Sequence, residues 1–206
     1  MQAIIVFDFG GVLFDWNPDY LYQKLIPDPS ERAWFLQHVC NGTWNIEQDR
    51  GRSLTDGTAA KIAEFPEYAE LIEAFYARWT EMLPGLLPEG MALFEALESA
   101  GYPIFGLTNW SNETFPYAWE HYPFLQRITD IVVSGQEQII KPDPAIYHLM
   151  YQRILQHHPA AKPEDLIFID DSAINAQGAC NVGWYGIHHT SAAATAQQLR
   201  DKGLKF

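Results

Sequence analysis

The residues best suited to chemistry in this sequence are carboxylates that directly follow apolar runs. Asp8 comes after "AIIVF", and the adjacent pair Asp170 and Asp171 ends "LIFIDD". A carboxylate can attack phosphorus or an electrophilic carbon and so divide one difficult displacement into two easier steps through a covalent intermediate. Two adjacent carboxylates repel each other unless a cation relieves the repulsion, and hard oxygen ligands favour Mg²⁺. The sequence thus contains a candidate nucleophile and a candidate magnesium site.

Three further polar residues are placed in the same way. Thr108 and Asn109 end "YPIFGLTN", and Lys141 stands in "QIIKPDP". A hydroxyl and an amide can hold the oxygens of a phosphoryl group, although capping of a strand end is an alternative role for both. A lysine can neutralise a nucleophile and a transferring phosphoryl group. The apolar residues before Lys141 and the helix start that "PDP" indicates after it argue against an exposed surface lysine.

The apolar runs predict the elements that must bring these polar residues together. Each run is short and continuous, which is typical of a fully buried strand in a parallel sheet. The runs lie within residues 3–11, 102–109, 130–135, 165–171 and, more weakly, 183–189. Helical periodicity fills the intervals, and alternating strands and helices predict a doubly wound α/β sheet. In such sheets ligands bind outside the carboxyl ends of the strands, where the polar residues fall.

One stretch interrupts this alternation. Between about Asn17 and Met82 no strand is evident, whereas apolar residues recur at helical spacing, most clearly from Tyr68 to Leu83. The prolines and glycines of "LPGLLPEG" at 83–90 mark the return to the sheet. We therefore predict an α/β core formed by residues 1–16 and 84–206, with an inserted α-helical domain formed by residues 17–83.

The composition argues against several classes of partner. The chain has 206 residues, 48% of them hydrophobic, which is enough for a substantial core. Its net charge of −13 repels phosphate backbones, so we expect no nucleic-acid partner. No apolar run approaches the roughly 20 residues that span a bilayer, and "MQAIIVFDFG" lacks the features of a signal peptide. We expect a cytoplasmic protein without a membrane partner, and the oligomeric state does not follow from the sequence.

Four segments stand in an order that is typical of one superfamily. They are "FDFGGV" at 7–12, "GLTNWS" at 106–111, "KPDPAIY" at 141–147 and "FIDDSAIN" at 168–175. Together they resemble the four motifs of the haloacid dehalogenase (HAD) superfamily, and the helical insertion after the first motif resembles its α-helical (C1) cap. The resemblance covers nearly the whole chain and implies a Rossmann-like hydrolase core of subfamily IA type.

The resemblance also implies a role for each motif residue. Asp8 would be the nucleophile, Thr108 and Asn109 would hold non-bridging phosphate oxygens, and Lys141 would neutralise charge. The implied Mg²⁺ ligands are the carboxylates of Asp8 and Asp171, the carbonyl of Gly10 and, through water, Asp170. Asn175, one helical turn further on, would orient these groups or contact the substrate, with capping of the helix as an alternative.

Gly10 departs from the pattern of most phosphatases of this superfamily, which carry an acid two residues after the nucleophile. That acid protonates the leaving group and later activates water, and its loss typically costs about 10²- to 10⁴-fold in rate. A metal-binding carbonyl needs no side chain, so the metal site is spared. Phosphatases with Asp-x-Gly in this motif are known, notably for sugar 1-phosphates. The resemblance therefore implies a Mg²⁺-dependent phosphatase for small phosphate monoesters, sugar phosphates among them, that forms an aspartyl-phosphate.

Two other functions are compatible with the same motifs. A metal-free 2-haloacid dehalogenase would use Asp8 against carbon, but those enzymes usually carry an aromatic residue at the position of Gly10 and lack the first fourth-motif acid, here Asp170. They also require a cap arginine for the substrate carboxylate, for which the sequence offers Arg32, Arg50 and Arg52. A non-catalytic protein that binds a phosphorylated ligand is the other alternative, but binding alone would not need a nucleophile.

Substrate recognition is expected where the cap meets the core. The loop after the first predicted strand projects Trp16 between them, where contact with substrate and packing between cap and core are equal alternatives. "EQDRGR" at 47–52 resembles a short loop between cap helices that would bring Arg50 toward the site, with an exposed surface position as the alternative. A cap that closes over the site leaves room for a small phosphorylated molecule rather than a macromolecule.

Overall fold

The central element of the protein is a five-stranded parallel sheet. The structure is a computed structural model that describes residues 3–206. The strand order is β5–β4–β1–β6–β7, and every neighbouring pair is parallel. The strands are β1 (Ile4–Phe7), β4 (Ile104–Thr108), β5 (Ile131–Val133), β6 (Leu166–Asp170) and β7 (Tyr185–His188). Each apolar run of the sequence therefore forms a strand of one sheet, as predicted.

The other regular elements of the described residues are mostly helical. The α-helices are α1 (Asp19–Leu25), α2 (Pro29–His38), α3 (Gly42–Asp49), α4 (Leu54–Glu64), α5 (Ala69–Ala77), α6 (Pro88–Ser99), α7 (Phe115–His121), α8 (Ser134–Glu137), α9 (Pro144–His157), α10 (Ala173–Asn181) and α11 (Ala192–Asp201). The 3₁₀ helices are η1 (Pro66–Tyr68), η2 (Trp79–Met82), η3 (Pro123–Arg127) and η4 (Pro163–Asp165). No helix within residues 3–206 has the length and hydropathy that crossing a bilayer requires.

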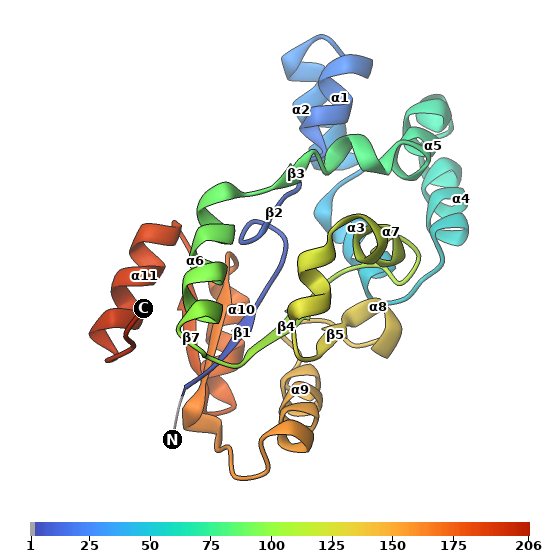
Figure 1. Cartoon of the computed structure of the whole chain (residues 1–206). Helices are drawn as coiled ribbons and strands as arrows, with labels where there is room; N and C mark the ends of the chain where they lie inside the picture. Colours follow the sequence, from blue (N-terminus) through green and yellow to red (C-terminus); the bar gives the residue numbers. More distant parts are fainter. Residues whose placement is uncertain (1–2) are drawn as a thin grey trace.

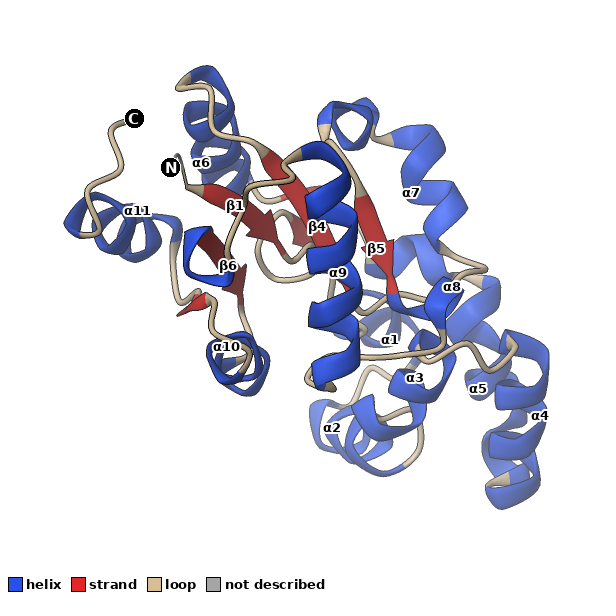
Figure 2. Cartoon of the chain, turned by 90° about the horizontal axis from the view of Figure 1, so that it is seen from below, coloured by secondary structure: helices blue, strands red, loops and turns tan. Residues whose placement is uncertain are grey.

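Helices cover both faces of the sheet (Figure 2). Ile5 and Phe7 of β1 belong to a buried cluster with residues of α6 and α11, whereas Ile4 and Val6 belong to a second cluster with residues of α9 and α10. Successive side chains of a strand point to opposite faces, so both faces of β1 are buried. This explains why the runs are continuously apolar rather than alternating, and it confirms the doubly wound α/β fold.

The chain between β1 and α6 contains the predicted helical insertion. Helices α1 to α5 lie across the top and the right of the molecule in Figure 1, to one side of the sheet. Their starts are set by side chains: Asp28, Asn41 and Ser53 each accept a hydrogen bond from a backbone N–H three residues later, at α2, α3 and α4. The helical character of this stretch is confirmed, and the division of the chain at residues 17 and 83 stays a prediction.

A small second sheet joins the two passages between the helical insertion and the core. β2 (Phe14–Asp15) pairs antiparallel with β3 (Gly85–Leu86). Two residues per strand are too few to show a periodic pattern, so the sequence does not predict this sheet. Phe14 is fully buried, and its ring contacts those of Phe9, Trp110, Tyr122 and Phe124. The connection between insertion and core is therefore packed firmly onto the core.

Candidate active site

Three carboxylates meet at the carboxyl end of the sheet. Asp8 directly follows β1, and Asp170 ends the neighbouring strand β6. Because Phe7 and Ile169 lie opposite each other, the two strands deliver these acids side by side. One carboxylate oxygen from each of Asp8, Asp170 and Asp171 lies within 4.8 Å of the others. The donors are all hard oxygen atoms, so the cluster suits Mg²⁺ better than a softer metal.

A buried lysine holds this cluster together. The Nζ of Lys141 lies 2.8 Å from Asp8 Oδ1 and 2.7 Å from Asp170 Oδ2, and it donates to the carbonyl of Leu107 at 3.1 Å. Its side chain has no solvent exposure. Burial alone would lower the pKa of Lys141, but the charges of Asp170 and Asp8 raise it above its usual value. Lys141 is therefore a charged interior group and not a surface lysine.

Negative charge exceeds positive charge in this cluster. Burial raises the pKa of Asp8 to about 8; Lys141 opposes the rise, and Asp170 and Asp171 add to it. Burial and the charge of Asp170 also raise the pKa of Asp171. One ammonium cannot balance three carboxylates, so a divalent cation would complete the charge of the site. This imbalance is the electrostatic reason to expect a metal here.

The two glycines of the first motif differ in what they permit. Gly11 has a φ of +67°, and a Cβ at this position would collide with the carboxylate of Asp171, so the backbone requires glycine here. A Cβ at Gly10 would meet nothing within 4 Å. The absence of an acid at position 10 is therefore not imposed by packing.

The amide of Asn109 is bonded to the backbone of Lys141. Its Oδ1 accepts the Lys141 N–H at 2.8 Å, and its Nδ2 donates to the Lys141 carbonyl at 3.2 Å. This pair of bonds fixes the loop that carries the lysine, which is a positioning task that the sequence does not predict. The second N–H of the Asn109 amide is left for another acceptor. Thr108, the last residue of β4, is 1% exposed and lies next to this amide in the chain.

Asn175 contacts Asp170 and is not among the residues that line the pocket described below. It lies in α10, and its Nδ2 is 3.1 and 3.3 Å from the two carboxylate oxygens of Asp170. The backbone N–H of Ser172 donates to the same carboxylate at 2.8 Å. Fully buried Asp170 thus accepts from Lys141, Ser172 and Asn175, whereas Asp171 is exposed. Asp171 has the freer carboxylate for direct metal binding.

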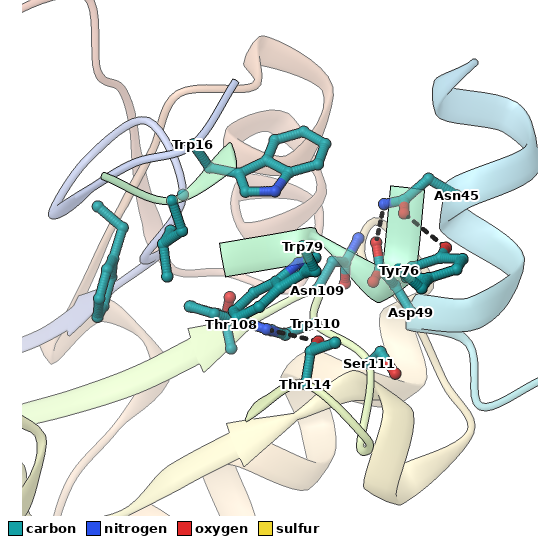
Figure 3. Close-up of a pocket in the computed structure, with 13 residues that line it drawn as sticks. Trp16, Asn45, Asp49, Tyr76, Trp79, Thr108, Asn109, Trp110, Ser111 and Thr114 are labelled. Atoms are coloured by element: carbon teal, nitrogen blue, oxygen red, sulfur yellow. Dashed lines mark hydrogen bonds between the residues drawn. The ribbon is translucent and has the colours of Figure 1, made fainter. Parts of the chain in front are cut away.

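A pocket adjoins the cluster where the helical insertion meets the core (Figure 3). The space between its walls is about 540 Å³, including the part open to solvent. Its lining includes Gly10, two residues after Asp8, and Thr108 and Asn109, the latter bonded to the Lys141 backbone. The rest of the lining consists of Phe14, Trp16, Asn45, Asp49, Tyr76, Trp79, Leu83, Trp110, Ser111 and Thr114. Trp16 is 36% exposed and lines the pocket, and its contact with substrate stays a prediction.

Arg50 does not line this pocket, and its neighbour Asp49 does. The Nε of Arg50 lies 3.7 Å from Oε1 of Glu47, and both side chains are 45% exposed. The segment 47–52 was expected to be a loop, but α3 extends through Asp49. Successive helical residues point about 100° apart, so the helix turns the acid inward and leaves the arginine at the surface.

Asp49 is held by its own helix and by α8 of the core. Within α3, Asn45 Nδ2 donates to Asp49 Oδ2 at 3.1 Å, and from α8 the hydroxyl of Ser134 donates to the Asp49 carbonyl at 2.5 Å. Burial raises the pKa of Asp49 to about 7, while the backbone N–H of Ser111 and the charge of Lys141 lower it. Within the segment 47–52 the sequence directs attention to Arg50 and not to Asp49, because the chain is rich in acids.

Comparisons with known proteins agree with this fold. No family model matches the chain. The sesquiterpene phosphatase astK of Aspergillus oryzae is 27% identical over 199 residues, which cover 95% of this chain and 93% of that protein. A HAD family enzyme of Bacteroides thetaiotaomicron in complex with magnesium matches with a TM-score of 0.64 at 16% identity, over 92% of this chain and 96% of that chain. The L-2-haloacid dehalogenase of Xanthobacter autotrophicus, with chloropropionic acid covalently bound, has a TM-score of 0.62 at 16% identity, over 100% of this chain and 85% of that chain.

These likenesses concern nearly the whole chain. The two solved structures share its fold, and the similarity to the Aspergillus protein extends over almost the full length of both chains. Three of the four motif segments stand at or just beyond the carboxyl ends of β1, β4 and β6, and the segment 141–147 follows α8 and begins α9. In its fold and in its four motif segments, the chain is similar to haloacid dehalogenase-like hydrolases.

Proposed function

We propose that the protein is a Mg²⁺-dependent phosphohydrolase that acts on small phosphate monoesters through an aspartyl-phosphate. The observation that carries this proposal is the contact of Lys141 with both Asp8 and Asp170 inside a cluster of three carboxylates. In a chain with a net charge of −13, a phosphate dianion needs local positive charge. A buried ammonium and a group of cation ligands supply it at the same place.

The residues of the core divide the reaction among them. Asp8 attacks phosphorus, and Lys141 stabilises the negative charge on the nucleophile and on the transferring group. The hydroxyl of Thr108 and the remaining amide N–H of Asn109 hold non-bridging oxygens. Asn109 has a second task, because its bonds to the Lys141 backbone keep the ammonium in place.

The carboxylates and the first-motif backbone would hold the metal. Asp8 and Asp171 would bind it directly, together with the carbonyl of Gly10, and Asp170 would act through water. Asp170 is suited to the indirect role because Lys141 and Asn175 already bond its oxygens. When bound, Mg²⁺ supplies charge stabilisation and orientation of the phosphate oxygens.

The pocket favours a phosphatase over a 2-haloacid dehalogenase. None of the described residues that line it is a lysine or an arginine, so a substrate carboxylate would lack a cationic partner there. The three arginines that the sequence offered for this task have acidic or amide neighbours instead: Arg32 pairs with Asp19, Arg50 lies near Glu47, and Arg52 donates to Gln48.

The walls of the pocket favour an apolar leaving group. Polar side chains in the wall are bonded to one another: Trp110 Nε1 donates to Thr114 Oγ1 at 3.0 Å, and the Tyr76 hydroxyl donates to Asn45 Oδ1 at 2.9 Å. The hydroxyls of a sugar would need partners that this wall offers sparingly, whereas an apolar alcohol would bury its surface against aromatic rings. We therefore favour phosphates of apolar alcohols over sugar phosphates, in keeping with the name of the Aspergillus sesquiterpene phosphatase.

Phosphate release from p-nitrophenyl phosphate, measured with Mg²⁺ and with EDTA beside halide release from 2-chloropropionate, tests the reaction class. We expect phosphate release that EDTA abolishes and no halide release. Halide release that persists in EDTA would establish the dehalogenase instead. The leaving group is tested by comparing n-octyl phosphate with glucose 6-phosphate, for which we expect kcat/KM to differ by about tenfold or more in favour of the octyl ester.

A further inference from the structure

The proposed reaction lacks a proton donor on the core side of the pocket. An alkoxide is a poor leaving group, so its departure from phosphorus is assisted by a proton delivered to the bridging oxygen. Gly10 has no side chain to deliver it, although a Cβ at this position would have free space around it. Thr108 and Asn109 do not titrate near neutral pH. A proton carrier must therefore come from another part of the molecule.

We infer that the carboxyl group of Asp49, on the helical wall of the pocket, is the general acid and base of this reaction. The inference rests on the phosphatase function proposed above. Asp49 and Gly10 line the same pocket, and no other described residue of the lining carries a carboxyl, imidazole or thiol group. In Figure 3, Asp49 stands with Asn45 and Tyr76 on the helical side, and Thr108 and Asn109 belong to the core side.

The carboxyl group of Asp49 is held in place by neutral partners. The Gln48 amide donates to the Tyr76 hydroxyl at 2.9 Å, and that hydroxyl donates to Asn45 Oδ1 at 2.9 Å. With its oxygen occupied in this way, the Asn45 amide presents its N–H to Asp49 Oδ2 at 3.1 Å. The hydroxyl of Ser134 fixes the Asp49 backbone to the core. The carboxyl group therefore keeps its position relative to both walls.

The charged and titratable groups around Asp49 suit a group that gains and loses a proton. Lys141 approaches from the core, Tyr76 from α5, and the neutral groups are Asn45 and the backbone N–H of Ser111. Burial raises the pKa of Asp49 to about 7, and Ser111 and Lys141 lower it. A carboxyl group with a pKa near neutrality can donate a proton in one step and accept one in the next.

Two steps balance the proposed reaction. In the first, a bond forms between an Asp8 oxygen and phosphorus while the bond between phosphorus and the alcohol oxygen breaks, and the proton of Asp49 moves to that alcohol oxygen. In the second, a water oxygen attacks phosphorus, the Asp49 carboxylate takes a proton from the water, and the bond to Asp8 breaks. The net change converts ester and water into alcohol and inorganic phosphate, and both carboxyl groups return to their starting states.

Asp49→Asn tests the inference, because it keeps the shape of the side chain and removes the titrating proton. We expect kcat/KM for n-octyl phosphate to fall about 10²- to 10³-fold. The rate of the first turnover of p-nitrophenyl phosphate should fall less than about tenfold, since p-nitrophenolate leaves without a proton. This first turnover should appear as a burst, and a slow steady state should follow because the aspartyl-phosphate accumulates. Asp56→Asn, at an exposed position of α4, is the matched control and should change neither rate.

A rescue and a pH profile make the test independent of any folding defect. Gly10→Asp added to Asp49→Asn should restore the octyl phosphate rate at least tenfold, because it returns a carboxyl group to the pocket. In the wild type, kcat/KM for octyl phosphate should fall above about pH 7 while the first turnover of p-nitrophenyl phosphate does not. Parallel pH profiles for the two substrates would overturn the inference.

The failure of this inference is distinguishable from failure of the proposed function. A wild-type protein that releases no phosphate from either ester would overturn the function and this inference with it. Two outcomes with an active wild type would overturn the role of Asp49 alone. In the first, Asp49→Asn hydrolyses octyl phosphate as fast as the wild type. In the second, the first turnover of Asp49→Asn is slowed equally for both esters.

Discussion

Carboxylates stand in opposite surroundings on the two sides of the pocket. In the cluster that adjoins the core wall, Asp8 and Asp170 lie 2.8 and 2.7 Å from one fully buried ammonium. On the helical wall, the side chain of Asp49 has the amide of Asn45 and the backbone N–H of Ser111 as its direct partners. Neighbouring parallel strands deliver several charges to one edge, where those charges compensate one another. A helix end instead delivers a single acid between aromatic rings.

This difference determines what each acid can do. An acid that contacts an ammonium is favoured in its ionised form, which is the form that attacks phosphorus. Asp49 has no ammonium in direct contact, and burial raises its pKa to about 7, at which a carboxyl group can give and take a proton. We therefore place the proposed nucleophile and the proposed proton carrier on separate parts of one chain. Five predictions test it, and they begin with the largest expected effect.

Removing the nucleophile should have the largest effect. Asp8→Asn keeps the size of the side chain and an acceptor for the Phe9 N–H, which Asp8 Oδ1 binds at 2.7 Å. We expect phosphate release to fall about 10⁴-fold or more, because no covalent intermediate forms. Circular dichroism checks that the fold is retained. Turnover within tenfold of the wild type would show that Asp8 is not the nucleophile.

Removing the ammonium should expose how strongly the core wall depends on charge pairing. Lys141→Met leaves Asp8 and Asp170 buried without a cation, which should cost about 3–5 kcal/mol in the free energy of unfolding and about 10³-fold in turnover. Denaturant titration and phosphate release measure the two effects. The matched control is Lys24→Met, which breaks the surface pair with Glu81 and should cost less than about 1 kcal/mol. Equal losses for the two variants would contradict the special status of Lys141.

Shortening the aromatic wall should weaken substrate binding without changing the chemistry. Trp16→Ala should raise KM for n-octyl phosphate about tenfold, because the apolar chain loses a ring to pack against, and kcat should change little. Trp34→Ala is the control, since Trp34 is similarly exposed at 42% but does not line the pocket. An unchanged KM for Trp16→Ala would indicate that Trp16 serves packing between cap and core.

Adding an acid to the core wall should make the two walls more alike. Gly10→Asp has room for its side chain and should raise kcat/KM for n-octyl phosphate about 3- to 10-fold, and less for p-nitrophenyl phosphate. Gly42→Asp, at another position where a Cβ would meet nothing within 4 Å, should leave both values unchanged. A gain of equal size on both substrates would mean that the proton transfer does not limit the octyl ester.

The smallest expected effect is a pH-dependent change in stability. Burial raises the pKa of folded Asp49 to about 7, whereas an exposed aspartate titrates at about 3.9. Between these values the folded protein binds a proton that the unfolded chain has lost, so stability falls as the pH rises from about 4 to about 7. Asp49→Asn removes this loss and should raise Tm relative to the wild type at pH 8, but not at pH 4, by about 2–4 °C for each kcal/mol recovered. Thermal scans at the two pH values measure it, and equal shifts at both would assign the effect to packing.

Much of the core wall could be predicted from the sequence. The continuous apolar runs predicted the strands, and the polar residues at their ends predicted which side chains would meet, because parallel strands share one carboxyl edge. Asp8, Asp170 and Lys141 meet there. The helical wall was harder to predict, since the angular position of a residue at a helix end depends on where that helix stops. Asp49 and Arg50 are adjacent in the chain, but Asp49 lines the pocket and Arg50 is exposed.

The sequence by itself determined the order of strands and helices, the helical insertion and the edge at which the acids gather, because these follow from local periodicity and from the geometry of parallel sheets. Only the tertiary structure decided that Asn109 would hold Lys141 across 32 residues, that β2 would pair with β3, and that Asp49 would face the pocket. The physical reason is the same for all three. Each depends on contacts between segments distant in the chain, and such contacts leave no periodic pattern in either segment alone.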